Sequence, residues 1–146
     1  MISKKKKSCF SWNEANALLP DLAARLKRLQ HKKEIYSRMH DTLFLHELVC
    51  VAERSGGFAD PEDDLETGIH ALEEAIEDLA QDVEMIFASG VILRDIERGR
   101  VEMPGELNGH KIYFSWVLGE SEIRFYRRRD GMPEERLELP SSVLSR

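Results

Sequence analysis

A change of hydrophobic period near residue 90 is the feature that most constrains how this chain can fold. Upstream of it, large apolar residues alternate in steps of four and three: Leu65, Ile69, Leu72, Ile76, Leu79, Val83 and Ile86. This spacing is typical of a helix with one apolar face, and Gly90 follows it as a C-cap. Downstream the period is two, which predicts β-strands. We therefore expect an α+β fold.

Two further helices are predicted before residue 60. Ser11 and Glu14 form a capping box for a short N-terminal helix. Pro20 suits the first turn of a second helix, so a break is expected just before it. That second helix carries an apolar line at seven-residue intervals: Leu22, Leu29, Tyr36, Leu43 and Cys50. Glycines at 56–57 and the cap at 60–61 then predict a long antiparallel helical hairpin.

The period of two predicts a four-stranded antiparallel meander. Its strands are Val91 to Ile96, Val101 to Met103, Lys111 to Val117 and Glu122 to Arg127. The connections are short, and one contains the Asn108-Gly109 pair that favours a tight hairpin. Only Leu137 and Leu139 of the polar tail could add a short edge strand.

Alternation in the third strand assigns side chains to the two faces of the sheet. One face is expected to pack on the apolar side chains of the helices: Ile112, Phe114, Trp116, Ile123 and Phe125. The other carries Tyr113, Ser115 and Val117, and we expect Arg124 and Tyr126 to join it, next to Arg128. Phenol and guanidinium groups suit stacking and phosphate contact. The candidate binding residues are therefore Tyr113, Arg124, Tyr126 and Arg128. Half-solvated cross-strand pairs, or contacts to a helix, are the favoured explanation of these side chains.

The chain length of 146 residues fits a single domain with one core. We expect a basic flexible N-terminus (1–9), a helical part (10–89), the sheet (90–139) and a tail (140–146). The two cysteines, Cys9 and Cys50, form no C-x-x-C pair, which favours a reducing compartment. The apolar stretch Met85 to Leu93 is too short to span a membrane. A cytoplasmic protein without membrane contact is predicted.

Charge is unevenly distributed along the chain. The net charge is −6, and residues 61–89 hold ten acidic residues and no Lys or Arg. Residues 20–54 hold seven basic and five acidic residues. The two helices of the hairpin are thus electrostatically matched, and acidity in the middle of the chain makes nucleic acid an unlikely partner.

Residues that could bind a metal ion occur on both long helices. His46 and Cys50 are four apart on one helix, and Glu66 and His70 are four apart on the next. A turn near Gly57 would place residue 46 opposite residue 70, so these four ligands could converge, with Glu47 and Glu73 as a competing set. Against this, Glu66 and His70 flank the apolar line and can face water. We expect no bound metal and no cofactor.

Catalytic signals are sparse. The sequence has no G-x-S-x-G motif, and no nucleophile follows a strand. Glu120 lies at a strand connection close to Trp116, where burial could raise its pKa, and Arg136 could pair with it. A turn residue that accepts backbone N–H bonds is the alternative explanation of Glu120. No catalytic residue is predicted beyond these two weak candidates, and an enzyme is the less favoured class.

Two groups of residues resemble the bacterial family catalogued as domain of unknown function 2203. The first group is Phe10-Ser11 followed by Glu14-Ala15-Asn16-Ala17-Leu18-Leu19-Pro20. The second is Gly90-Val91, Arg94-Asp95, Gly99, Pro104, Tyr113, Trp116, Leu118-Gly119-Glu120, Glu122-Ile123, Gly131 and Arg136. The resemblance implies a prokaryotic cytoplasmic protein and brings no established activity. The family's last strand ends in a Trp-His pair where this chain has Tyr126-Arg127, so chemistry that used that histidine would be lost here.

We expect a non-enzymatic binding or assembly module that forms a homodimer through its hairpin, together with an unknown protein partner. The long helices exceed the length that a small sheet can cover, and Phe44 and Leu48 form a second apolar stripe outside the hairpin seam. A monomer would result if Phe10 and Trp12 folded back over that stripe. The alternative function is a small enzyme or metal-binding protein that uses Glu120 and Arg136 or the hairpin histidines.

Overall fold

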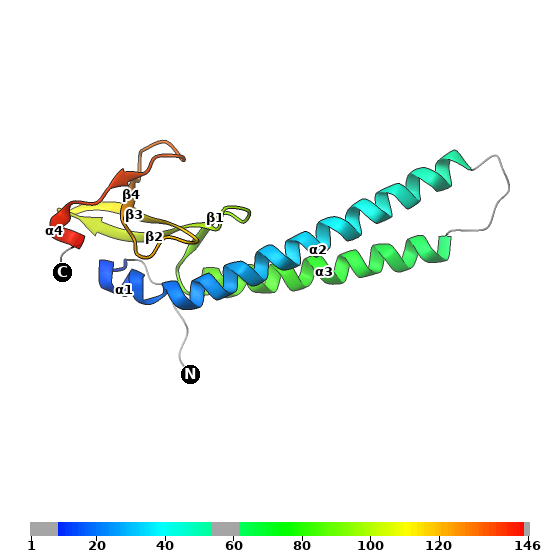
Figure 1. The fold of residues 1–146 in the computed structure, drawn as a ribbon, viewed down its shortest axis with the longest axis horizontal. Helices are drawn as coiled ribbons and strands as arrows, with labels where there is room; N and C mark the ends of the chain where they lie inside the picture. Colours follow the sequence, from blue (N-terminus) through cyan, green and yellow to red (C-terminus); the bar gives the residue numbers. More distant parts are fainter. Residues whose placement is uncertain (1–8, 54–61, 145–146) are drawn as a thin grey trace. The chain divides into compact units, whose positions relative to one another are not determined.

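The computed structural model describes residues 9–53 and 62–144 and confirms the α+β fold. Its elements are α1 (Trp12–Ala17), α2 (Leu19–Ala52), α3 (Glu62–Ala88), β1 (Ile92–Asp95), β2 (Arg100–Leu107), β3 (His110–Val117), β4 (Phe125–Arg128), β5 (Leu137–Glu138) and α4 (Ser141–Leu144) (Figure 1). The predicted basic N-terminus, the turn at 56–57 and the cap at 60–61 lie outside the described residues, except for Cys9. No described helix is both long and apolar enough to cross a membrane.

The chain divides into two compact units, which are described separately. Unit 1 contains the residues up to Gln30 and those from Asp82 onward, and unit 2 contains His31 to Gln81. Helices α2 and α3 therefore contribute to both units.

The N-terminal helix of unit 1 begins as the sequence predicts. Ser11 Oγ accepts a hydrogen bond from the Glu14 backbone N–H at 3.0 Å, and Glu14 Oε1 accepts one from the Ser11 N–H at 2.9 Å. This capping box satisfies two donors at the helix start. The predicted break also occurs, since α1 ends at Ala17 and α2 begins at Leu19.

The sheet is an antiparallel meander with the strand order β1-β2-β3-β4-β5 (Figure 1). The prediction of four strands was one short, because Leu137–Glu138 does form an edge strand beside β4. Asn108 and Gly109 connect β2 to β3 with φ values of 51° and 81°. Two consecutive positive φ angles are the signature of the predicted tight hairpin turn.

Strand β2 continues through Pro104, where the sequence suggested a loop. Pro104 has no backbone N–H and cannot donate a hydrogen bond to a neighbouring strand. Proline is therefore tolerated within a strand only where no neighbouring strand needs that hydrogen bond. Strand β1 pairs with β2 only as far as Glu102. Beyond that point Phe10 takes the place beside β2, where its N–H donates to the Pro104 carbonyl at 2.7 Å. The N-terminal segment thus replaces the missing end of β1.

The core of unit 1 combines apolar side chains from helices and sheet. The buried residues include Leu22, Leu26, Leu29, Ile86, Val101, Met103, Ile112, Phe114 and Trp116. Polar contacts fix the helices to strand connections at the rim of this core. Trp12 Nε1 donates to the Ile123 carbonyl, the Ile123 N–H donates to Asn16 Oδ1, and Gln30 Nε2 donates to two carbonyls of the β1–β2 turn.

The register between β3 and β4 corrects the predicted faces of the sheet. Phe114 pairs with Tyr126 and Ser115 pairs with Phe125, so Tyr126 lies on the apolar face and Phe125 on the opposite one. The prediction counted residues through 118–124, but this connection is irregular, and the Ile123 N–H bonds to Asn16 outside the sheet. Since side chains alternate with a period of two, a one-residue error reverses every assignment.

In unit 2 the two helices lie side by side and antiparallel (Figure 1). Lys32 Nζ on α2 forms an ion pair with Asp78 on α3 at 2.7 Å, and Leu43 fits against Gly68. These two contacts place residue 70 beside residue 40 or 41. The expectation that residue 70 lies opposite residue 46 was therefore wrong by more than one helical turn. It was obtained by assuming that the hairpin turns near Gly57, and the observed contacts between α2 and α3 do not fit that assumption.

Candidate functional site

A carboxylate surrounded by arginines lies on the face of the sheet opposite the apolar core. Glu102 of β2 is fully buried, and Arg127 of β4 donates to both of its oxygens, at 2.6 Å and 3.0 Å. Arg94 of β1 donates to the same carboxylate at 2.7 Å, and Arg100 approaches it at 3.5 Å. We call this the arginine face and define it by Glu102, Tyr113 and these three arginines.

The electrostatics of this cluster keep Glu102 ionised. Burial alone would raise the pKa of its carboxyl group, but the hydrogen bonds from Arg127 and Arg94 outweigh burial, and the pKa of Glu102 lies below its ordinary value. The same hydrogen bonds raise the pKa of Arg127. Arg100 is also buried, donates to the Pro133 carbonyl at 2.8 Å, and its Nε has no hydrogen-bond partner among the described residues.

Tyr113 provides an aromatic base for the guanidinium groups of the arginine face. The Cζ atoms of Arg94, Arg127 and Arg129 lie 5.9, 4.9 and 4.4 Å from its ring centroid. A cation within about 6 Å of a ring centroid is attracted to the π face. Three cations share this ring, so positive charge is concentrated at one place on the sheet.

Glu120 and Arg136 form a second, separate ion pair. Arg136 donates to both Glu120 oxygens, at 2.7 and 3.1 Å, and to Ser115 Oγ at 3.0 Å. Glu120 Oε1 also accepts from the Val117 N–H at 2.8 Å, and the Arg136 guanidinium stacks on Phe125 at 4.2 Å. Both carboxylate oxygens are thus engaged in closing the turn after β3. This arrangement matches the turn-residue explanation of Glu120.

The four predicted binding residues do not share one surface. Tyr113 belongs to the arginine face, whereas Tyr126 and Arg128 pair with the apolar-face residues of β3. Arg124 precedes β4 and forms an ion pair with Glu122 at 3.1 Å. Arg128 is bound by Glu135, whose pKa is lowered by hydrogen bonds from that arginine. The expectation that Arg124 and Tyr126 join Tyr113 on one face was wrong, for the register reason given above.

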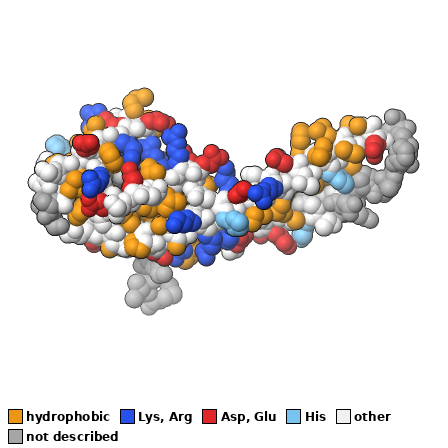
Figure 2. Space-filling view, viewed as in Figure 1, with side chains coloured by type: hydrophobic (Ala, Val, Ile, Leu, Met, Phe, Trp, Pro, Cys, Tyr) orange, Lys and Arg blue, Asp and Glu red, His pale blue; other side chains and the backbone are white. Residues whose placement is uncertain are grey.

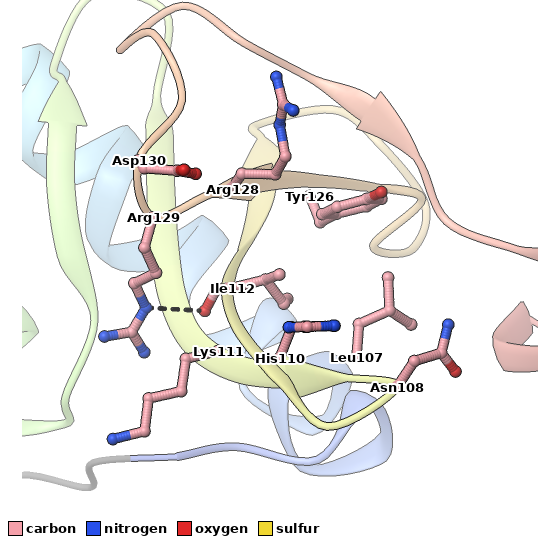
Figure 3. A pocket seen from close by; sticks show the side chains of 9 residues that line it. All are labelled: Leu107, Asn108, His110, Lys111, Ile112, Tyr126, Arg128, Arg129 and Asp130. Atoms are coloured by element: carbon pink, nitrogen blue, oxygen red, sulfur yellow. Dashed lines mark hydrogen bonds between the residues drawn. The ribbon is translucent and has the colours of Figure 1, made fainter.

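A pocket of about 720 Å³ lies at the end of the sheet formed by the β2–β3 turn. Its lining is Leu107, Asn108, His110, Lys111, Ile112, Tyr126, Arg128, Arg129 and Asp130. Figure 3 shows that the side chains of Lys111 and Arg129 point to one side, away from Leu107 and Tyr126. Arg129 Nε donates to the Ile112 carbonyl at 3.3 Å. The cationic ends therefore gather outside the apolar part of the pocket.

The candidate metal ligands lie on α2 and α3 in unit 2. His46 and Cys50 are half-buried on α2, and the Nε2 of His46 has no hydrogen-bond partner among the described residues. Glu66 and His70 are exposed on α3, with His70 near Glu73 and Glu74. In the described part of the chain, no three His, Cys, Asp or Glu side chains are arranged to hold a metal ion.

The surface of unit 2 carries many exposed large apolar side chains. Its exposed large apolar side chains are Ile35, Phe44, Leu45, Leu48, Val49, Val51, Ile69 and Ile76. Of the side chains whose burial is described between residues 31 and 81, only that of Leu79 is buried. Figure 2 shows apolar side chains gathered on the helices close to the stretch drawn in grey. A groove of about 410 Å³ on one flank is lined by Ile35, Arg38, Met39, Thr42, Leu43, His46, Gly68 and Ala71.

Comparison with known protein families shows to which family the chain belongs. A family model described as "Uncharacterized conserved protein (DUF2203)" matches residues 8–139. The chain belongs to the DUF2203 family. The description of this family names no activity, so DUF2203 membership assigns no function. No curated protein and no solved structure matches the chain.

The residues at the centre of the arginine face of this DUF2203 chain, Glu102 and its arginine partners, were not predicted from the sequence. Glu102 lies between Val101 and Met103 in a predicted strand, and alternation alone places it opposite two core residues. A carboxylate at such a position in the middle of a strand indicates that the side chain is buried or paired with a cation. The identity of its partners depends on the β4 register, which the sequence did not determine. Arg127 is the main partner of Glu102, because it donates to both carboxylate oxygens.

Proposed function

We propose that this protein is an assembly module without enzymatic activity, and that it forms a twofold homodimer through the outer surface of α2 in unit 2. The observation that carries this proposal concerns the side chains of unit 2 whose burial is described: eight large apolar ones are exposed, and a single one is buried. Two helices alone bury one seam between them, and stable helical units add further helices around a common core. The free thiols of Cys9 and Cys50 fit a reducing cytoplasm as the place of action.

Charge determines which helix faces the second copy. Between Leu65 and Gln81, α3 carries five acidic residues and no Lys or Arg. Contact between two copies of α3 would bring like charges together. The unit 2 part of α2, from His31 to Ala52, is balanced, with three Lys or Arg and three Asp or Glu residues. Contact between two copies of α2 is therefore favoured.

The apolar residues of α2 lie where an isologous contact needs them. Phe44, Leu48 and Val51 are 56%, 50% and 54% exposed. Leu43 faces Gly68 of α3, and helical spacing turns these three side chains about 80–140° away from Leu43, so they form a stripe outside that contact. An antiparallel α2–α2 contact across a twofold axis would pair this stripe with itself. Leu45 and Val49 extend the same apolar area toward the groove.

The homodimer predicts that sedimentation equilibrium at tens of micromolar gives the mass of two chains. Replacing Phe44 and Leu48 together with glutamate should weaken dimerisation by at least about 100-fold, or about 2.7 kcal/mol, because each substitution occurs twice across the axis. Circular dichroism checks that the variant stays helical.

The matched control replaces Ile69 and Ile76 with glutamate. These residues are exposed to a similar degree, 44% and 49%, and the change adds the same charge to α3 instead of α2. The control should remain a dimer. A one-chain mass for the unchanged protein sinks the proposal, and equal dissociation of both double variants would show that the contact is not specific to α2.

A further inference from the structure

The arginine face holds more positive charge than its own carboxylate can balance. Arg94, Arg100 and Arg127 converge on the single carboxylate of Glu102, and Arg129 joins Arg94 and Arg127 over the Tyr113 ring. Arg127 donates two of the three hydrogen bonds that the Glu102 side chain accepts from Arg127 and Arg94. Arg94 donates to one of the oxygens that Arg127 also contacts. One carboxylate carries a single negative charge, so most of the positive charge of the three arginines is not balanced by Glu102. Gathering like charges costs free energy unless an anion balances them.

Two further cations beside the arginine face, Arg129 and Lys111, are exposed and have no ion-pair partner in the described part of the chain. Arg129 bonds only to the Ile112 carbonyl and the Tyr113 ring. Lys111 lies two residues before Tyr113 on the same face of β3, and Figure 3 shows its ammonium group on the same side as the Arg129 guanidinium. Nearby negative charges are Glu106, which is opposite Lys111 in the β2–β3 register, and Asp130. Neither forms an ion pair with Lys111 or Arg129 within the residues described.

We propose that the arginine face binds one phosphate group over Tyr113, and that Arg94, Arg129 and Lys111 provide its direct contacts. A phosphate monoester is doubly charged near neutral pH, which matches an excess of at least two cations. Arginine forks bind phosphate oxygens in pairs, and Lys111 adds a point charge. Glu102 and Arg127 act as positioning residues, because they are buried and hold the neighbouring guanidinium groups in place.

The site suits a small phosphate compound better than a nucleic acid strand. Its cations lie around one aromatic ring, and the chain as a whole carries a net charge of −6. Further phosphates along a strand would meet a surface without matching charge.

Calorimetric titration of the full chain with inorganic phosphate and with phenyl phosphate, at low ionic strength in chloride buffer, tests this site. Saturable binding with a Kd of about 1 mM or below is expected for one or both ligands. Equal affinities identify the phosphate group alone as the bound part, and tighter binding of phenyl phosphate identifies an ester; both results support the proposal. Replacing Arg129 and Lys111 with glutamine should weaken binding at least about tenfold.

The control replaces Arg98 and Arg124 with glutamine, which removes the same charge from two exposed, ion-paired arginines of unit 1. Its affinity should stay within about twofold of the original. The absence of saturable binding overturns the proposal, as does an equal loss in both double variants. A short single-stranded oligonucleotide that binds more than about tenfold tighter than phenyl phosphate, and depends on Arg129 and Lys111, would assign the face to nucleic acid instead. Unchanged urea midpoints of the variants exclude unfolding as the cause of any loss.

Discussion

Replacing Glu102 with glutamine is expected to lower the free energy of unfolding of unit 1 by about 3–5 kcal/mol. The substitution keeps the shape of the side chain but removes the negative charge that accepts two hydrogen bonds from Arg127 and lies 3.5 Å from Arg100. The side chains of these two arginines are 9% and 10% exposed. Uncompensated buried cations cost more than the lost ion pair itself. Urea unfolding followed by tryptophan fluorescence measures this loss directly, because both tryptophans, Trp12 and Trp116, belong to unit 1.

The control for this experiment is Glu122→Gln, which removes a carboxylate from an ion pair with the exposed Arg124. Exposed pairs contribute little, so the control should cost less than about 1 kcal/mol. A loss for Glu102→Gln as small as that of the control would mean that the arginines find other partners or water.

Glu102 should also make the free energy of unfolding depend on pH in the acidic range. The pKa of Glu102 is lowered in the folded state, so its contribution is fully present above the unfolded-state pKa of about 4.3 and is lost as pH falls toward the folded-state pKa. Between pH 5 and pH 3 the unchanged protein should therefore lose more stability than the Glu102→Gln variant. Equal losses of stability in the two proteins over this pH range would show that Glu102 does not cause the acid sensitivity.

Local sequence signals predicted the elements of this fold well. The capping box at Ser11, the break before Pro20 and the Asn108-Gly109 turn depend on a few neighbouring residues, and each appears where it was expected. The heptad line of α3 is also local, since it depends only on helical spacing. Signals of this kind do not require knowledge of distant contacts.

Pairing between distant segments could not be predicted in the same way. The face of Tyr126 depends on its partner Phe114, and the neighbour of His70 depends on how the hairpin turns, so counting residues along the chain gave the wrong answer in both cases. The arginine face was missed for the same reason, because Glu102 meets Arg127 only through the registers of β2, β3 and β4. The residues of the candidate site are therefore brought together by the strand registers, which the sequence alone did not determine.

The β2 extension through Pro104 and Gly105 shows how a distant side chain can override a local loop signal. Glycine weakens a strand interior unless something covers it. Here the Phe114 ring lies over Gly105, and an added Cβ would be 2.7 Å from Cδ2 of that ring and closer still to its Cε2. An aromatic ring that covers a strand glycine supplies the packing that the glycine lacks. Gly105 and Phe114 thus form one packing unit in the core.

Replacing Gly105 with valine should accordingly destabilise unit 1 by at least about 2 kcal/mol, because the Phe114 ring must leave its place in a close-packed core. Phe114→Ala alone should cost about 3–5 kcal/mol through the cavity that it leaves. In the double variant the valine occupies part of that cavity, so its cost should fall short of the sum by at least about 1 kcal/mol. Glu106→Val adds the same side chain at the next, exposed position and should change stability by no more than about 0.5 kcal/mol. Strictly additive losses in urea unfolding would show that Gly105 and Phe114 do not depend on each other.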